Sequence, residues 1–340
     1  MRIAAAAGLL LLGLLIAAAG AWGAIALAVA GPQVELLRLG LATGFGAASL
    51  AALVALALRR WRWRWRAVAA YLGLFAAMLV WFFGIEPSNE RDWLAENAVL
   101  PHATIDGDIV TVHNIRNFSY RTETDFTPAY YDKRFDLSKF EGVDLVASYW
   151  MGPDIAHIFL SFAFAGGDHL AISIEARKEK GEGYSTVKGF FRQYELYYVV
   201  ADERDLIGVR TNHRKDPPEQ VYVYRLQGNL DAGRRLFMEY LDQINALAKR
   251  PAFYNTLTTN CTTNIWLHSR VNPEHVPFDW KILASGHVPE YLYEQGRLAG
   301  GGSQSFAEVQ RRALVNARAQ AAGDAADFSR RIRDTAPRKP

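Results

Sequence analysis

The chain has 340 residues, of which 50% are hydrophobic, and its 38 basic and 35 acidic side chains leave a formal net charge of +3. A charge so close to balance gives no argument for a nucleic-acid partner. The single cysteine, Cys261, excludes an intramolecular disulfide and is therefore either an inert or a reactive thiol.

Three apolar runs near the start of the chain predict transmembrane helices. They cover residues 3–30, 41–58 and 67–85, and a helix needs roughly 20 residues to cross a bilayer core. A cleaved signal peptide is the alternative for the first run. Its apolar part is longer than the roughly 7–15 residues of such a segment, and two more apolar runs follow. We therefore expect a membrane domain over residues 1–88.

Arginines between the second and third runs predict the orientation. The loop "RRWRWRWR" contains Arg59, Arg60, Arg62, Arg64 and Arg66, and short loops rich in arginine stay in the cytoplasm. An RNA-binding patch is the alternative, which we reject because both flanks are apolar and of membrane length. The sequence thus predicts a multi-pass protein of the bacterial cytoplasmic (inner) membrane. Its C-terminal domain should face the periplasm or the exterior.

The outer domain, expected over residues 89–297, begins with strands and ends with helices. Asp231 is placed to cap a helix that ends before Pro251, because apolar residues between them recur at helical spacing. A second helix should begin near Cys261, with Asn260 or a threonine as its cap. This order predicts an α+β fold, a sheet with helices packed on one side. Strand-like runs cover residues 107–115, 143–150, 156–164, 169–177, 193–200 and 220–226.

A cysteine in the first turn of a helix has the chemistry of a nucleophile. The partial positive charge at a helix N-terminus favours the thiolate, which is the reactive form. The thiol also faces an oxidising compartment if the topology is right. An inert buried cysteine is the alternative, and a reactive thiol requires a base within reach of Cys261.

Of the eight histidines, His157 is the best placed to act as that base. It begins the strand 156–164, and the turn "AGGDH" joins this strand to the strand 169–177 as a hairpin. In such a hairpin Glu175 lies near His157 and can orient its imidazole. The alternative is a core histidine with Glu175 and Arg177 as a surface ion pair. His268 follows Cys261 by two helical turns, about 10 Å along the axis, which is too far for direct contact.

The other histidines are weaker candidates. His169 lies at the turn end of the hairpin, and His275 and His287 lie in loops that contain proline. A surface role is expected for those in polar, turn-like surroundings, namely His102, His113 and His213.

Motifs for metals and cofactors are absent from the sequence. There is no HExxH or CxxC, and the histidines do not cluster at ligand spacing. No phosphate-binding loop or dinucleotide fingerprint is present either. We therefore expect neither a metal nor a cofactor.

Three sequence blocks resemble a known family. The blocks "HIFLSFAFAGGDHLAISIEARKEKGEGYS", "ELYYVVADERDLIGVR" and "FYNTLTTNCTTNI" are similar to the DUF4105 family. That family is associated with the periplasmic domain of the Lnb-type lipoprotein intramolecular transacylases. The resemblance spans residues 144–293 and implies a permuted papain-like, NlpC/P60-like domain, in which the histidine strand precedes the cysteine helix. The "NC" start also resembles permuted acyltransferases such as lecithin–retinol acyltransferase, except that Thr262 and Thr263 differ from the usual residues.

The resemblance assigns roles residue by residue. It implies Cys261 as the nucleophile, His157 as the base and Glu175 as the residue that orients the base. Other residues of the same motifs are expected to shape the substrate pocket, namely Asn260, Tyr254, Asn255, Ser173 and Arg177.

Three functions remain open on the sequence alone. The first is an acyltransferase that takes an acyl group from a membrane lipid or lipoprotein as a thioester and passes it to an amine. The second is a thiol hydrolase of cell-wall peptides, and the third is a membrane-tethered binding domain. Membrane anchoring and the resemblance favour the acyltransferase. The segment 298–340 is expected to be a flexible or helical tail without chemistry.

Overall fold

The computed structural model describes residues 2–58 and 61–334. Arg59 and Arg60 of the expected cytoplasmic loop lie outside these residues, as do residues 335–340 at the end of the tail. The chain divides into two compact units. Unit 1 contains residues 1–87 and 185–193, and unit 2 contains residues 88–184 and 194–340.

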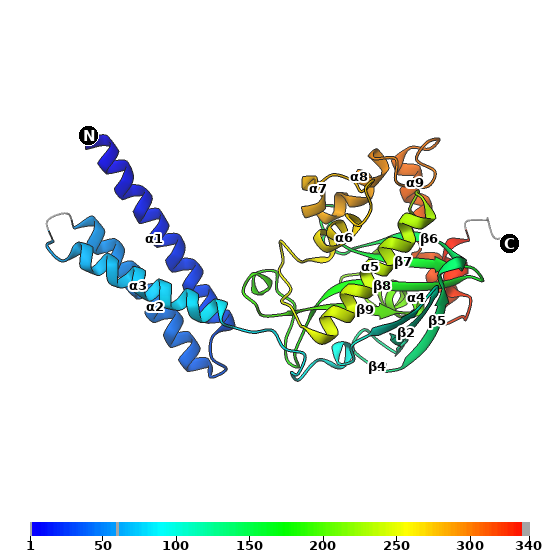
Figure 1. Cartoon of the computed structure of the whole chain (residues 1–340), viewed down its shortest axis with the longest axis horizontal. Helices are drawn as coiled ribbons and strands as arrows, with labels where there is room; N and C mark the ends of the chain where they lie inside the picture. Colours follow the sequence, from blue (N-terminus) through cyan, green and yellow to red (C-terminus); the bar gives the residue numbers. More distant parts are fainter. Residues whose placement is uncertain (1, 59–60, 335–340) are drawn as a thin grey trace. The chain divides into compact units, whose positions relative to one another are not determined.

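Unit 1 contains the three expected apolar helices, labelled in Figure 1. They are α1 (Arg2–Ala30), α2 (Glu35–Ala57) and α3 (Arg64–Phe83), and all three are long and apolar enough to cross a membrane. Helix α2 begins six residues earlier than expected, because polar residues at a helix end can still be helical where they reach the headgroups.

Small residues bring the three helices close together. Gly20 faces Ser49 so closely that a Cβ at this position would lie 2.1 Å from the Ser49 Oγ. Ser49 and Tyr71 both donate to the carbonyl of Ile16, at 3.2 and 3.4 Å. Inside a bilayer the hydrophobic effect does not drive helices together, because lipid is as apolar as the helix surface. Close packing at small residues and hydrogen bonds between helices hold them together instead.

Unit 2 is built on a sheet of eight strands in the order β1-β2-β9-β8-β7-β6-β10, with β5 paired to β2, among the residues described. Nearly all of the pairings are antiparallel; β2 and β9 share one parallel pair. The strands are β1 (His102–Asp106), β2 (Ile109–Arg116), β5 (Tyr130–Asp136), β6 (Phe140–Tyr149), β7 (Ala156–Phe164), β8 (Asp168–Arg177), β9 (Glu195–Ala201) and β10 (Gln220–Arg225).

The sequence pattern did not predict two of these strands or a small hairpin. Strand β1 exposes most of its side chains, and β5 carries Asp132, Lys133 and Arg134 in its centre. Neither shows the apolar alternation that marks a half-buried strand. The hairpin of β3 (Ser119–Tyr120) and β4 (Phe126–Thr127) is too short to give a pattern.

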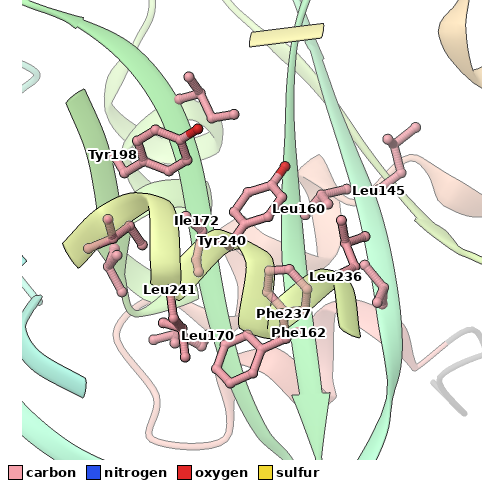
Figure 2. Packing of buried hydrophobic residues seen from close by; sticks show 14 of the residues in the cluster. Leu145, Leu160, Phe162, Leu170, Ile172, Tyr198, Leu236, Phe237, Tyr240 and Leu241 are labelled. Carbon is pink, nitrogen blue, oxygen red and sulfur yellow. The ribbon is translucent and has the colours of Figure 1, made fainter. Parts of the chain in front are cut away.

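Helix α5 (Leu230–Lys249) crosses one face of the sheet (Figure 1). Figure 2 shows Phe237 and Tyr240 of α5 against Phe162 of β7, with ring centroids 4.9 and 5.6 Å apart. Asn229 caps the helix by accepting from the backbone N–H of Asp231. The expectation that Asp231 is the cap is therefore wrong by two residues, because asparagine at the preceding turn serves equally well.

The opposite face is covered by α4 (Glu203–Gly208), α10 (Asn316–Ala322) and α11 (Phe328–Arg333). Tail residues Ala319, Phe328 and Ile332 are almost wholly buried in this second core. Of the two alternatives for the tail, flexible or helical, the structure has the helical one over much of residues 306–333, and these helices pack on unit 2. The remaining helices are α6 (Cys261–Ser269), α7 (Trp280–Leu283), α8 (Val288–Glu294) and α9 (Phe306–Ala313).

Candidate active site

Cys261 is the first residue of α6, as the sequence predicted. Asn260 caps this helix: its Oδ1 accepts from the backbone N–H of Thr263 at 2.8 Å and from the hydroxyl of Thr262 at 3.0 Å. The amide of Asn260 also donates to the Thr256 carbonyl at 2.7 Å. Asn260 therefore holds the helix start and does not point a free amide at a substrate. The thiol is half-buried.

The hairpin of β7 and β8 brings His157 and Glu175 together. Its ladder ends at the pair Leu160 and Ile172, although both strands continue in chain order. Extending the register by three residues would place Glu175 opposite His157. There the side chains meet: Nε2 of His157 lies 3.0 Å from Oε1 of Glu175. The sequence predicted this contact because the turn fixes the register.

Ser173 completes the contact between the imidazole and the carboxylate. Its Oγ lies 2.6 Å from Nε2 of His157 and donates to Oε1 of Glu175 at 2.7 Å. The carboxylate thus holds the ring both directly and through the hydroxyl. Ser173 is fully buried, and its two hydrogen bonds position the histidine.

Cys261 reaches the same imidazole from α6. The thiol forms a hydrogen bond with His157 and another with the backbone N–H of Ile158, a group of β7 beyond the end of the ladder with β8. The separation of the two strands therefore gives the start of α6 its access to the histidine. Cysteine, histidine and carboxylate form one connected chain.

Electrostatics favour the charged form of all three groups. Burial alone would lower the pKa of His157, but the charge of Glu175 and the hydrogen bonds that the imidazole donates to Cys261 and Glu175 raise it to about 9. Burial opposes ionisation of the thiol, yet the hydrogen bond and charge of His157 lower the pKa of Cys261. Burial likewise opposes ionisation of Glu175, but His157 and Arg210 hold the pKa of that carboxyl well below its usual range. At neutral pH these directions favour a thiolate beside an imidazolium.

A second layer of charges, not found from the sequence, supports Glu175. Arg210 lies 3.4 Å from Oε1 of Glu175, and its guanidinium stacks over the ring of Phe159. On its other side Arg210 is 3.7 Å from Glu219, which also pairs with Arg214. Arg210 belongs to a π-helical turn, Val209–His213, and such turns are frequent at functional sites.

The loop before Cys261 is shaped by Asn255 and Tyr254. The side chain of Asn255 accepts from the backbone N–H groups of Leu257 and Thr258 at 3.0 and 3.1 Å, which folds the loop into a turn. Tyr254 is buried and its hydroxyl lies 3.4 Å from that of Tyr184. Burial, and then the negative charge of Cys261, raise the pKa of Tyr254.

Arg177 does not line this site, contrary to the sequence expectation. Its guanidinium donates to the backbone carbonyls of Asn97 and Ala98 and stacks over Trp93 at 4.1 Å. With a relative exposure of 2%, it anchors the segment that precedes β1. Alternation puts Arg177 on the face of Glu175, but two residues move it about 7 Å along the strand, under that segment.

His268 is buried and has polar partners that the sequence did not predict. It does not touch the thiol, as the helical spacing predicted, but it is buried with Nε2 2.5 Å from the hydroxyl of Tyr198 and Nδ1 3.4 Å from Glu239. Burial lowers the pKa of His268, which favours the neutral ring. The hydroxyl of Tyr240, next to this ring, has no hydrogen-bond partner among the residues described.

The other histidines lie elsewhere in unit 2. His102 and His113 stack on each other on β1 and β2, and His113 pairs with Asp132. His169 lies at the hairpin turn and His287 pairs with Asp154. A cavity of about 400 Å³ is also separate from the thiol, since the tail, β6 and β10 line it. In the described ranges, no group of three histidine, cysteine or carboxylate side chains is arranged to hold a metal ion.

The fold and site define a class of protein: an α+β domain with a cysteine–histidine–carboxylate cluster, following helices long enough to cross a membrane. Residues 126–286 match the family described as the Lnb N-terminal periplasmic domain. This part of the chain, which contains Cys261, His157 and Glu175, is therefore similar to Lnb-type periplasmic domains. The match and the three helices fit a membrane-anchored protein with a periplasmic domain. No curated protein and no solved structure gives a match to the chain.

Proposed function

We propose that this protein is a cysteine-dependent acyltransferase of the bacterial cytoplasmic membrane. It takes an acyl group from a lipid or lipoprotein ester, holds it as a thioester on Cys261, and passes it to an amine. The observation that carries the proposal is the single connected chain of Cys261, His157 and Glu175 at a helix start. The similarity to Lnb-type domains and the membrane anchor support a lipid-borne substrate.

We infer that the domain is a permuted papain-like domain of the NlpC/P60 type, as in the DUF4105 family. In this chain the histidine strand β7 precedes the cysteine helix α6. The thiol lies at a helix N-terminus and the histidine on a strand, with a carboxylate behind it. This is the arrangement of a papain-type site with the order of its two halves exchanged.

The first half of the reaction makes the thioester. The Cys261 thiolate attacks the ester carbonyl carbon, forming an S–C bond and a tetrahedral oxyanion. The backbone N–H of Cys261 lies in the first turn of α6, where no helical carbonyl accepts it, and it can donate to that oxyanion. Collapse of the intermediate breaks the C–O bond, and imidazolium His157 gives its proton to the leaving alcohol.

Asn264 is the second donor that we assign to the oxyanion. It follows Cys261 by three residues and so shares its face of α6. Its side chain is buried, and its Nδ2 has no hydrogen-bond partner in the part of the chain that is described. A buried amide left unpaired in the resting protein has a donor to offer the reaction.

The second half of the reaction releases the product. The acceptor amine attacks the thioester, and His157, now neutral, takes the proton that the amine loses. The C–S bond breaks, the amide leaves and the thiolate is restored next to the imidazolium. Glu175 and Ser173 hold the ring throughout, so the same imidazole serves as acid and then as base.

The test uses the full chain in lipid nanodiscs with a synthetic diacylated lipopeptide that has a free N-terminal amine. Intact mass spectrometry should show one acyl chain on the protein, removed by hydroxylamine, and then an N-acylated lyso-lipopeptide. Cys261→Ala should give no adduct. His113→Ala is the matched control for His157→Ala, because His113 also pairs with a carboxylate on a strand but lies at the β1–β2 edge.

Other outcomes would identify the alternatives. An acyl-enzyme that releases only free fatty acid would make the protein a hydrolase of lipid esters. Release of peptides from purified cell wall, with no acyl adduct, would favour the cell-wall hydrolase. If no adduct forms, no hydrolysis occurs and Cys261 is alkylated as an ordinary thiol is, the membrane-tethered binding domain would be the favoured function.

A further inference from the structure

Residues 185–193, between β8 and β9, belong with the transmembrane helices and not with the sheet. Phe191 is buried in the core of unit 1, where its ring lies 6.1 Å from that of Trp22 in α1. Trp22 in turn packs edge-on against Phe82 of α3 at 5.0 Å. This segment is therefore a fourth component of the membrane unit.

Arg192 fixes the segment to the end of α3. Its Nη1 donates to the carbonyls of Phe83 and Ile85 at 3.1 and 2.8 Å, and its guanidinium stacks over the rings of Phe82 and Phe83. A cation at a helix C-terminus also complements the helix dipole. Arg192 has a φ of 55°, which is unusual for a residue with a side chain and persists only where contacts hold it.

The contacts place the segment at the outer end of the spans. Helix α3 has 20 residues, about 30 Å at 1.5 Å per residue, which equals the hydrocarbon thickness of a bilayer. The carbonyls bound by Arg192 belong to its last residue, Phe83, and to Ile85 just beyond. Trp22 lies eight residues before the end of α1, about 12 Å along its axis. Phe191 therefore lies at or below the level where the spans end.

The tip of the segment exposes apolar side chains beside a cation. Val187 and Phe190 are 55% and 42% exposed, and Lys188 between them is exposed too. Segments that lie at a bilayer interface combine apolar groups that enter the acyl boundary with cations that meet lipid phosphates. We propose that residues 185–193 enter the outer leaflet of the bilayer, with Val187 and Phe190 among the acyl chains and Lys188 at the headgroups.

The residues that flank the segment in the chain belong to unit 2. The rings of Tyr184 and Tyr194 stack at 5.9 Å, and the hydroxyl of Tyr184 lies 3.4 Å from that of Tyr254, which precedes Cys261 by seven residues. We propose that a lipid ester bound at the segment is the substrate that Cys261 attacks. This last step rests on the proposed acyl transfer, whereas the bilayer contact does not.

The bilayer contact can be tested without activity, because Cys261 is the only cysteine. In a Cys261→Ala background, Phe190→Cys is labelled with the fluorophore NBD and placed in nanodiscs whose lipids have nitroxides on their acyl chains. Leu14→Cys, exposed in the middle of α1, is the reference inside the bilayer, and Thr124→Cys, exposed in the β3–β4 hairpin, is the reference in water.

We expect the Phe190 label to emit at shorter wavelength than the Thr124 label and to be quenched by the nitroxides as the Leu14 label is. Quenching at Leu14 but not at Phe190 would overturn the proposal. The link to the site has a separate readout. Val187→Asp with Phe190→Asp should lower the ratio of acyl-enzyme formation from nanodisc lipopeptide to that from a water-soluble ester by about tenfold. If wild type forms no acyl-enzyme, the proposed function fails while the quenching result stands.

Discussion

The two faces of the sheet in unit 2 are made by the same strands but hold different chemistry. Toward α5, strand β7 presents Ile158, Leu160 and Phe162, all 0–1% exposed in an apolar core. On the other face the same strand presents His157 and Ser161, and Ser161 donates to the buried carboxylate of Glu203 at 2.6 Å. Strand β7 thus has an apolar core on one side and a core with buried charged groups on the other.

The α5 face stabilises the fold mainly by apolar burial, and the charged face mainly fixes the positions of polar side chains. Apolar burial contributes free energy in proportion to area and tolerates some movement. Buried ion pairs offset much of their attraction by desolvation, but they fix positions and directions. We therefore expect changes on the α5 face to alter unfolding without altering the chemistry of Cys261. Changes on the charged face should alter stability by leaving a buried charge unpaired and, next to His157, should alter the chemistry of Cys261 as well.

The largest effect should follow His157→Ala. Without the imidazole, the desolvation that raises the pKa of Cys261 loses its main counterweight, and the hydrogen bond from the backbone N–H of Ile158 remains. Removal of a general acid–base group lowers rates about 10²–10⁴-fold. Alkylation of Cys261 by iodoacetamide, measured from pH 5 to 10, should be fast below pH 8 in wild type and slow in the variant. Equal pH profiles would show an ordinary thiol and remove the basis of the enzyme proposal.

On the apolar face, Phe237→Ala should destabilise unit 2 by about 4 kcal/mol, because it removes a ring that contacts Phe162 and Phe164 and leaves a cavity. Phe237→Leu keeps most of the volume and should cost about 1 kcal/mol. Urea unfolding of the full chain in nanodiscs, followed by near-ultraviolet circular dichroism, measures both. At urea concentrations where the variants are still folded, the pH profiles of Cys261 alkylation should match that of wild type. A large shift in either profile would contradict the separation of the two faces.

Substitution of Arg333 in the tail removes ion pairs of the charged face. Its guanidinium binds Glu203 at 2.6 and 2.7 Å and Asp144 at 2.8 Å. Arg333→Met leaves Glu203 as a buried carboxylate without its main partner, which should cost about 3 kcal/mol in the same unfolding measurement. Arg330→Met, an exposed arginine of the same helix, should change stability by less than about 0.5 kcal/mol. Equal effects of the two would mean that the tail does not stabilise the sheet.

The sequence was sufficient for the contacts that lie within one hairpin or one helix start. The turn between β7 and β8 fixes the register that pairs His157 with Glu175, and Asn260 is a recognisable cap for the helix that begins at Cys261. Both are local, so strand alternation and capping rules reach them. Three apolar runs predicted the membrane helices for the same reason.

The remaining contacts are distant in the chain, and no local pattern indicates them. Arg210 reaches Glu175 from a π-helical turn, and Arg333 reaches Asp144 across 189 residues. No local pattern indicates that the tail packs on the sheet, because buried apolar residues such as Phe328 and Ile332 are few in each of its short helices. Arg177 lies on the predicted face, but alternation does not show that residues 89–98 cover it. Strand alternation predicts which face of the sheet a side chain lies on, but it does not predict which segment packs over that side chain.

Glu175→Gln should give a smaller change in the free energy of unfolding than Phe237→Ala or Arg333→Met, and that change should depend most strongly on pH. The pKa of His157 is raised from its usual 6.5 to about 9, so its pairing stabilises the fold fully below pH 6.5, and this stabilisation is lost as the pH rises through 9. The depressed pKa of Glu175 acts in the opposite direction, and its stabilisation is lost only in strong acid. Glutamine keeps the shape but removes the charge, so the wild type should be more stable than the variant by about 2 kcal/mol between pH 5 and 6.5. The difference should shrink toward zero from pH 6.5 to 9. Urea unfolding at each pH gives this curve, and a difference that stays constant over that range would mean that Glu175 acts by packing and not by its charge on His157.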